Sequence, residues 1–298
     1  PRNEPMPQGL NPPLRDVPMD RDPMVTPLLI NPPEWRATKR ITVERVAEMN
    51  FGPDNWLSRA EKNLFLHLIT LRENALAFSP EERGLLRREV GDPYRIPTVP
   101  HEPWQIRPIP IPMAVRPQFT ELVRERLRTG LYEQSTSAYS SPIFSVIKQD
   151  KKSLRIVHDL QRLNSVTIRD AGLPPRVEEF IDSMAGRVCY GLVDIMGGYD
   201  QRELHEESRP LTAFETQLGR LQLTRLPQGA TNSVAAYQAQ MTWILREDIP
   251  YSTQIFIDDG AVLGPRDDYE GRSVEGNSGI RRFIWEYAVT LERILFWI

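Results

Sequence analysis

Residues 255–263 read IFIDDGAVL, and this stretch decides the fold class because it sets two adjacent acids between two apolar runs. Two apolar runs joined by Asp-Gly are typical of an antiparallel hairpin, since glycine tolerates the positive φ of a tight turn. The turn is therefore expected at Asp258, Asp259 and Gly260. Taken alone, Asp258 and Asp259 are best interpreted as residues that serve the turn.

A further acid ends another apolar run. Residues 188–195 read VCYGLVDI and predict a buried strand that reaches Asp194. An unpaired carboxylate in a protein interior is costly, whereas several carboxylates together can hold Mg²⁺, which completes its octahedron with water and phosphate oxygens. Two such ions can catalyse an in-line displacement. The spacing of the acids leaves a metal site and structural acids as equal alternatives.

The composition is that of an ordinary soluble protein and excludes several classes. The 298 residues are 40% hydrophobic and 26% charged, with a formal net charge of -3, so nucleic-acid binding requires a local basic patch. The single cysteine, Cys189, excludes an internal disulfide framework and a Cys-rich zinc site. No apolar run reaches the roughly 18 residues of a membrane span, and the first residues lack a signal pattern. An intracellular location is expected.

The first third of the chain divides into three regions. Residues 1–35 show little periodicity and predict a poorly ordered linker, and residues 36–96 predict a helical region. Within it, Ser58 and Glu61 form a capping box before an amphipathic helix. The residues after Ser79 repeat this signal with Pro at the first helical position. The Pro-rich residues 97–113 that follow predict an extended strap.

After the strap, short strands alternate with helices. Residues 143–147 and 154–157 are apolar and predict a hairpin with a polar tip. Further helices are expected after Pro117, Thr231 or Asn232, and Gly279. A helix that starts at Pro174 is expected to turn four apolar side chains inward: Val177, Phe180, Ile181 and Met184.

Four segments of the chain closely resemble, in order, motifs of reverse transcriptases, and the closest likeness is to gypsy-type long-terminal-repeat retrotransposons of fungi. SPIFSVIKQDKKSLRIVHDLQRLN (141–164) is similar to the fingers motif. The segments that resemble the palm motifs are LVDIMGGYDQ (192–201), LPQGATNSVAAYQ (226–238) and FIDD (256–259). The likeness covers residues 35–298 and is far more specific than a pair of acids.

The resemblance implies an α+β right-hand polymerase core, with an antiparallel palm sheet and helices on one face. It implies an RNA-directed DNA polymerase that transfers a nucleotide from a dNTP to a primer 3′-hydroxyl. The implied parts are the fingers (114–172), the palm (173–199 and 226–270), a junction between them (200–225), and the start of the thumb or a connecting helix (271–298).

The resemblance also assigns residues to the chemistry. Asp194, Asp258 and Asp259 match the catalytic acids that bind two Mg²⁺ ions, with Mn²⁺ as a possible substitute. Ile195 would add its backbone carbonyl to the metal site. Tyr199 matches the aromatic gate that excludes a ribose 2′-hydroxyl; without the resemblance it would be a packing aromatic.

Other residues match the parts that bind the nucleotide. Lys148 and Arg155 match the cations that hold the triphosphate. Gln228 and Gly229 match the loop that packs on the nascent base pair. Lys151 and Lys152 are interpreted as a solvated hairpin tip, and Asn232 and Ser233 as helix caps.

The implied partners are an RNA or DNA template, its primer, and other domains of a retroelement polyprotein. No segment resembles a complete thumb, a protease, an RNase H or an integrase, so the sequence is expected to be a fragment. One alternative is an inactive or co-opted remnant that at most binds nucleic acid. A two-metal phosphodiesterase is another, but it leaves the fingers hairpin and Tyr199 unexplained. A cytoplasmic particle and the nucleus remain alternative locations.

Overall fold

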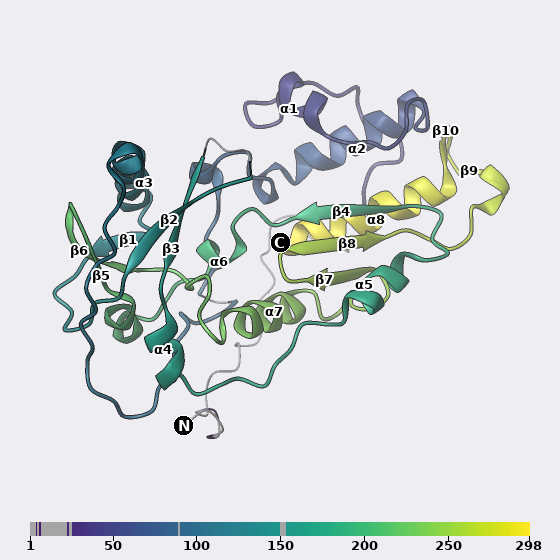
Figure 1. Ribbon diagram of the computed structural model, residues 1–298. Coiled ribbons are helices and arrows are strands. Elements are labelled where there is room, and N and C mark those ends of the chain that lie inside the picture. Colours follow the sequence, from purple (N-terminus) through teal and green to yellow (C-terminus); the bar gives the residue numbers. More distant parts are fainter. Residues whose placement is uncertain (1–3, 5, 7–22, 24–25, 89, 150–152) are drawn as a thin grey trace. The chain divides into compact units, whose positions relative to one another are not determined.

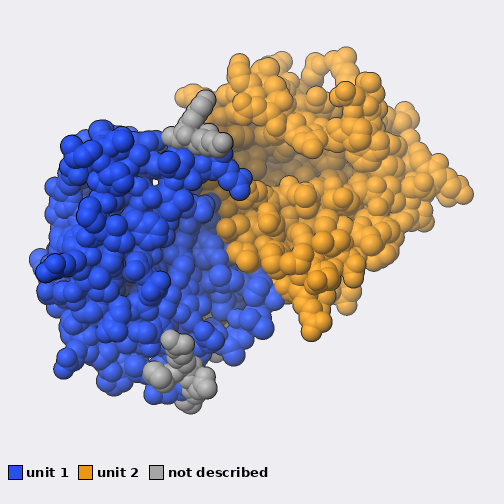
Figure 2. Space-filling view, viewed as in Figure 1, with its two compact units in different colours: residues 1–15, 79–174, 197–240 blue, residues 16–78, 175–196, 241–298 orange. Residues whose placement is uncertain are grey.

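The computed structural model describes residues 4, 6, 23, 26–88, 90–149 and 153–298, which form two compact units of helices and small antiparallel sheets (Figure 1). The first unit contains residues 79–174 and 197–240 together with described residues within 1–15 (Figure 2). The second contains residues 175–196 and 241–298 together with described residues within 16–78. Each unit is therefore assembled from segments that lie far apart in the sequence.

The first unit contains a three-stranded and a two-stranded antiparallel sheet. In the larger sheet, β6 (Gly219–Leu223) lies between β1 (Tyr132–Gln134) and β5 (Phe214–Thr216). The smaller is the hairpin β2 (Ile143–Ile147) and β3 (Leu154–His158), whose register pairs Ile143 with His158. The hairpin confirms the sequence prediction, and its tip at Lys151 and Lys152 lies outside the described residues.

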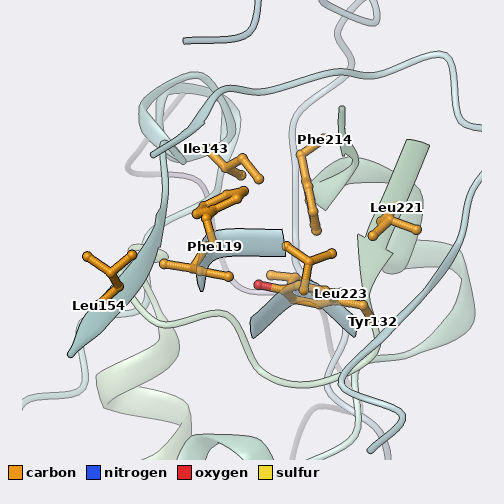
Figure 3. Packing of buried hydrophobic residues seen from close by; sticks show 9 residues of the cluster. Phe119, Tyr132, Ile143, Leu154, Phe214, Leu221 and Leu223 are labelled. Carbon is orange, nitrogen blue, oxygen red and sulfur yellow. The ribbon is translucent and has the colours of Figure 1, made fainter. Parts of the chain in front are cut away.

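The core of the first unit is apolar and comes from one helix and both sheets (Figure 3). Helix α3 (Arg116–Arg128) has Pro in its first turn and ends before Gly130, which has a φ of 71°. Phe119 of α3 and Phe214 of β5 are both buried. Burial of each such side chain contributes about 1.5–3 kcal/mol. The core comprises Phe119, Val123, Tyr132, Ile143, Leu154, Ile156, Phe214, Leu221 and Leu223.

A polar chain of three side chains is enclosed at the edge of this core. Arg126 donates to the Tyr132 hydroxyl over 2.7 Å, and that oxygen lies 2.9 Å from Nε2 of His158. Burial, together with the nearby charge of Arg126, lowers the pKa of His158 to about 3. Burial also raises the pKa of Tyr132 to about 12. His158 is therefore a neutral structural residue at physiological pH.

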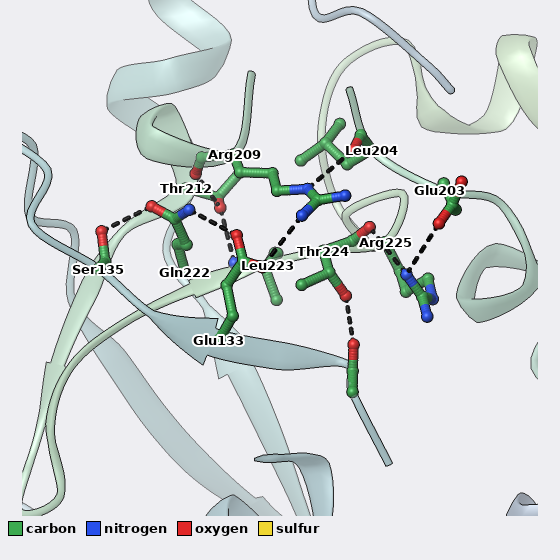
Figure 4. Close-up of polar contacts among 11 residues, drawn as sticks. Glu133, Ser135, Glu203, Leu204, Arg209, Thr212, Gln222, Leu223, Thr224 and Arg225 are labelled. Carbon is green, nitrogen blue, oxygen red and sulfur yellow. Dashed lines mark hydrogen bonds and ion pairs between the residues drawn. The ribbon is translucent and has the colours of Figure 1, made fainter. Parts of the chain in front are cut away.

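Polar side chains join β1 and β6 to the segment that precedes β5 (Figure 4). Glu133 accepts from Arg209 over 3.0 Å and from the amide of Gln222 over 2.7 Å. Thr212 accepts from the backbone N–H of Leu223. These bonds fix a sheet whose outer strands have only three residues each, too short to be stable alone.

The remaining elements of the first unit are short. Residues 97–112 contain no helix or strand, as expected of the strap. Ser79 is followed by one 3₁₀ turn in place of the expected helix, and its side chain makes no capping bond there. The other elements are the 3₁₀ helices η2 (Pro80–Glu82), η3 (Met113–Val115) and η4 (Glu206–Thr212) and the helices α4 (Gln161–Val166), α6 (Gly198–Gln201) and most of α7 (Ser233–Ile244).

The second unit is built on a three-stranded antiparallel sheet. Its central strand is β8 (Asp259–Leu263), between β4 (Tyr190–Asp194) and β7 (Thr253–Phe256). Helix α8 (Arg282–Trp297) packs against β8, and α5 (Val177–Met184) contacts β7 and β8. Figure 1 shows α8 running along the sheet.

Two predictions for this unit are wrong in part. Strand β4 is not buried as a whole, since Tyr190 is 52% and Leu192 68% exposed. The reason is that β4 lies at the edge of the sheet and alternate side chains point away from its packed face. Helix α5 packs through Phe180 against Phe256 but leaves Val177 and Ile181 exposed, so only part of its predicted apolar face is covered.

A buried ion pair joins the N-terminal helical region to α8. Helix α2 (Arg59–Leu71) begins with the predicted capping box of Ser58 and Glu61. The Glu61 carboxylate also accepts two bonds of 2.8 Å from the Arg281 guanidinium. Burial alone would raise the pKa of Glu61, but the bonds from Arg281 and Ser58 hold it below its usual value.

The other elements of the second unit lie around α2 and α8. Residues 26–35, within the expected linker, contain no helix or strand, yet Leu28 is buried and Trp35 donates to Thr70 over 3.0 Å. The sole cysteine, Cys189, is also buried, which raises its pKa to about 11. The elements are α1 (Val43–Glu48), the 3₁₀ helices η1 (Glu73–Ala75) and η5 (Tyr269–Gly271), and the hairpin β9 (Ser273–Val274) and β10 (Asn277–Arg281).

Within the described part of the chain, no helix has both the length and the apolar character needed to cross a membrane.

The enclosed His158 predicts a loss of stability in acid. Its pKa is about 3 in the folded protein and near 6.5 otherwise, so between these pH values only the unfolded chain binds the proton. The free energy of unfolding should therefore fall with decreasing pH from about 6.5, by up to about 1.4 kcal/mol per pH unit. Urea unfolding at several pH values should show a shallower decline for His158→Phe. Parallel declines in the two proteins would exclude this origin.

The pair of Glu61 and Arg281 predicts a large effect of removing one partner. Arg281→Met leaves the Glu61 carboxylate buried without its cation and should lower the free energy of unfolding by about 3 kcal/mol. Arg59→Met is the matched control, because Arg59 pairs with Glu34 in an exposed ion pair and should change stability by less than about 1 kcal/mol. Equal losses in urea unfolding for the two variants would contradict the prediction.

Candidate functional site

Two of the three predicted catalytic acids face each other across adjacent strands. The register of β4 and β8 pairs Asp194 directly with Asp259, and both side chains are exposed. Side chains paired in this way have Cβ atoms about 4.5–5.5 Å apart. Like charges opposite one another are destabilising, so the fold brings together two carboxylates that sheet pairing alone disfavours.

The third acid lies in the turn of the adjoining hairpin. Phe256 pairs with Asp259, so the two-residue loop is Ile257 and Asp258. The predicted turn of Asp258, Asp259 and Gly260 is therefore right for Asp258 and wrong for the other two residues, which belong to β8. Gly260 lies within β8, where an added Cβ would come within 3.1 Å of the Ile255 side chain, so glycine serves close packing there.

The hairpin carries a strained residue beside the acids. Ile257 has a φ of 58°, a conformation that is unfavourable for a β-branched side chain. The backbone N–H of Ile195, the residue after Asp194, donates to the carbonyl of Asp258 over 2.9 Å. This bond holds the turn against the end of β4. Strain of this kind is concentrated at functional sites.

Ile195 contributes its side chain to the apolar side of the sheet. It lines a small cavity with Val193, Ile255 and Ile294. Strand alternation places Val193 on the face opposite the acids. The sheet thus separates an apolar face from a face that carries Asp194 and Asp259.

The acids form a partial ligand set for a hard cation. Among the residues that the structure describes, no group of three or more His, Cys, Asp or Glu side chains is arranged to hold a metal ion. Two facing carboxylates with a third adjacent in the chain nevertheless supply the oxygen donors that Mg²⁺ prefers. Mg²⁺ is commonly held by one or two carboxylates, with water and substrate phosphates in its other positions.

The β2–β3 hairpin brings the two predicted phosphate-binding cations to one face. Arg155 pairs with Val146, and the backbone N–H of Lys148 donates to the carbonyl of Ser153 over 2.8 Å. Because residues two apart in a strand share a face, Lys148 and Arg155 are diagonal neighbours, and both are exposed.

The predicted base-packing loop is fixed by a residue to which the sequence assigned no role. Gln228 and Gly229 are exposed, and Gly229 has a φ of 90°. Asn164 donates to the carbonyl of Gly229 over 3.0 Å and accepts from the backbone N–H of Thr231 over 2.8 Å. An Asn at the end of the segment 141–164 was a signal for such a backbone bridge.

The side chains of Asn232 and Ser233, at the start of α7, bond to other segments of the chain. The Asn232 side chain donates to the carbonyl of Ile168 and accepts from the N–H of Asp170. The hydroxyl of Ser233 donates to the carbonyl of Pro227. These bonds tie the start of α7 to the segment after α4, so the expected role of Asn232 and Ser233 as caps alone is incomplete.

Tyr199 lies on the short helix α6 and packs against α7. Its ring stacks on that of Tyr237, with centroids 5.1 Å apart and an interplanar angle of 24°. An added Cβ at Gly198 would come within 2.1 Å of the Tyr237 hydroxyl oxygen. The glycine before Tyr199 is therefore required for this close approach.

Residues 146–275 match the family of reverse transcriptases (RNA-dependent DNA polymerases). This chain contains a reverse transcriptase domain. The matched region begins in β2 and extends past the β7–β8 hairpin, so it includes every residue that the sequence analysis assigned to the chemistry.

The relatives of this reverse transcriptase domain are polyproteins of mobile elements and viruses. The chain is 33% identical over 179 residues to the retrovirus-related Pol polyprotein from transposon opus of Drosophila melanogaster, covering 59% of this chain and 18% of that protein. Identity to the Pol polyprotein from transposon gypsy of the same organism is 28% over 185 residues, covering 60% and 18%. The chain spans less than a fifth of the length of these relatives.

Solved structures show the same fold. A foamy viral protease-reverse transcriptase in complex with an RNA/DNA hybrid superposes with a TM-score of 0.64 at 21% identity, covering 72% of this chain and 28% of that one. A prototype foamy virus protease-reverse transcriptase gives 0.63 at 23% identity, covering 76% and 29%. The predicted α+β polymerase fold and the gypsy-type relationship are confirmed.

The tight packing at Gly198 predicts a non-additive pair of substitutions. Gly198→Ala should lower the free energy of unfolding by about 1–3 kcal/mol, because the new methyl group overlaps the Tyr237 ring. In a Tyr237→Ala background the same change should cost far less, and the difference in urea unfolding measures the coupling. Additive losses would show that the two residues do not meet.

Proposed function

We propose that this domain is the RNA-directed DNA polymerase of a retrotransposon polyprotein, in which a primer 3′-hydroxyl attacks the α-phosphate of a dNTP and pyrophosphate leaves. The observation that carries the proposal is the pairing of Asp194 with Asp259 at the ends of adjacent strands in a reverse transcriptase domain. Solved structures of similar fold are described as complexes with an RNA/DNA hybrid or double-stranded DNA. They support a template and primer as partners of this chain.

Asp194 and Asp259, with Asp258 beside them, are proposed to hold two Mg²⁺ ions, and the backbone carbonyl of Ile195 adds a neutral donor. When bound, such ions activate the attacking hydroxyl and stabilise the leaving oxygen of an in-line displacement, and Mn²⁺ can replace Mg²⁺. The chain contributes the position of the carboxylates. β4 and β8 fix two of them by register, and the bond from Ile195 to Asp258 fixes the hairpin that carries the third.

The first unit supplies the proposed contacts to the nucleotide. Lys148 and Arg155 bind the triphosphate, where a planar guanidinium suits two phosphoryl oxygens at once and an ammonium adds a mobile charge. Gln228 and Gly229 pack on the nascent base pair, and Asn164 holds their backbone in place. Tyr199 closes the space beside the sugar, so that a ribose 2′-hydroxyl meets its ring.

The assignment of parts follows the same proposal. Residues 114–172 are proposed as the fingers, and residues 173–199 and 226–270 as the palm with the catalytic hairpin. Since the related polyproteins are several times longer than this chain, a protease, an RNase H and an integrase are proposed as its partners. An element that copies its RNA works inside the cell, in a cytoplasmic particle or the nucleus.

Loss of either paired carboxylate should abolish polymerisation without unfolding the protein. In the full-length protein with an RNA template, a DNA primer, dNTPs and Mg²⁺, Asp194→Asn or Asp259→Asn should lower the rate of primer extension at least about 100-fold. Glu275→Gln is the matched control, because Glu275 is an exposed acid of the same unit outside the site. It should keep the unsubstituted rate.

A folded protein that extends no primer with Mg²⁺ or Mn²⁺ would instead support an inactive or co-opted remnant. Circular dichroism of each variant checks that the fold is retained. Retention of full activity by Asp259→Asn would exclude the proposed role of the paired acids.

A further inference from the structure

The position of Tyr199 depends on contacts from outside its own helix. Helix α6 has only four residues, Gly198–Gln201, and its N-cap residue Gly197 makes no side-chain capping bond. Isolated helices shorter than about 12 residues are marginal in water. The segment that carries the proposed sugar gate therefore cannot hold itself in place.

A segment that precedes the recognised family region supplies part of this support. Nη1 of Arg83 lies 2.6 Å from the Asp200 carboxylate, and the two side chains are only 16% and 27% exposed. The Nε–H of Arg83 donates to the carbonyl of Pro80 over 3.2 Å, and the N–H of Leu86 donates to the carbonyl of Gln201 over 2.8 Å. The segment 80–86 is thus bonded to the second half of α6.

Arg83 also packs against the turn that starts α6. An added Cβ at Gly197, whose φ is 62°, would come within 2.4 Å of Nη1 of Arg83. One guanidinium therefore contacts Gly197 on one side of Tyr199 in the chain and Asp200 on the other. Tyr237 stacks on the Tyr199 ring itself. The backbone of α6 and the ring of Tyr199 are therefore held by two separate elements.

We propose that Arg83 is a positioning residue for sugar discrimination. Through Asp200 it holds α6 so that the Tyr199 ring keeps a fixed distance from the sugar of the incoming nucleotide. A gate against one hydroxyl group depends on placement to within a fraction of an ångström, and a misplacement of 1 Å can change a rate about 100-fold. Greater mobility of α6 should therefore increase incorporation of ribonucleotides at a level of mobility that still permits incorporation of deoxynucleotides. The inference rests on the proposed polymerase function.

Arg88, two residues after the segment 80–86, offers a matched control. Arg88 pairs with Glu203 over 3.2 Å, but its side chain is 70% exposed and does not contact α6 in the described contacts. Exposed ion pairs of this kind contribute little. Arg83→Ala and Arg88→Ala remove the same charge, so only a specific role of Arg83 separates their effects.

The test measures kcat/KM for dTTP and for UTP in single-nucleotide extension by the full-length protein. Arg83→Ala should lower the dTTP/UTP ratio about tenfold, which corresponds to about 1.4 kcal/mol of differential free energy. Arg88→Ala should leave the ratio unchanged. The exchanged pair, Arg83→Asp with Asp200→Arg, should restore part of the discrimination because it rebuilds the contact with reversed polarity.

An unchanged ratio in a folded, active Arg83→Ala protein overturns the inference and leaves the proposed function intact. If the unsubstituted protein extends no primer, the proposed function fails instead, and hydrogen exchange then reports on the contact itself. Arg83 holds α6 in place if the amides of residues 198–201 exchange faster in Arg83→Ala than in Arg88→Ala. Equal exchange of these amides in the two variants overturns the inference that Arg83 holds α6.

Discussion

The pairing of β4 with β8 is the constraint on which the site depends, because it sets Asp194 against Asp259. Two like charges opposite each other oppose strand pairing, so the sheet needs compensation from its other face. The alternation of side chains along the strands supplies this compensation, because it places Val193 and Ile255 on the other face, where they line a cavity with Ile294 of α8. The exposed face can therefore carry charge without loss of the sheet.

Helix α8 is in turn fixed by ion pairs with buried acids. Glu292, which is buried, pairs with Arg72 over 3.0 Å, and the buried Asp248 pairs with Arg293 over 2.6 Å. Such pairs contribute little net stability compared with apolar packing, but breaking one is costly. They make the packing of α8 specific. The helical region before the family match is thus part of what holds the strands that carry the proposed catalytic acids.

The sequence predicted those elements of the fold whose formation is decided within one short segment. The capping box of Ser58 and Glu61 and the hairpin 143–158 appear as expected, because cap and strand periodicity are local properties. The strands β1, β5 and β6 were not predicted, since three to five residues are stabilised mainly by partners distant in sequence. The turn was predicted at Asp258–Gly260 but lies at Ile257 and Asp258, because strand packing around Gly260 overrides the local Asp-Gly signal.

The order in which the second unit receives its segments has a consequence for synthesis on the ribosome. Glu61 and Arg281, which contact each other, are separated by 220 positions. Arg72 and its partner Glu292 are also separated by 220 positions. During translation α2 therefore emerges long before α8 can cover it, and contacts this distant in sequence form slowly. The apolar face of α2 is the surface that a chaperone would need to shield in the nascent chain.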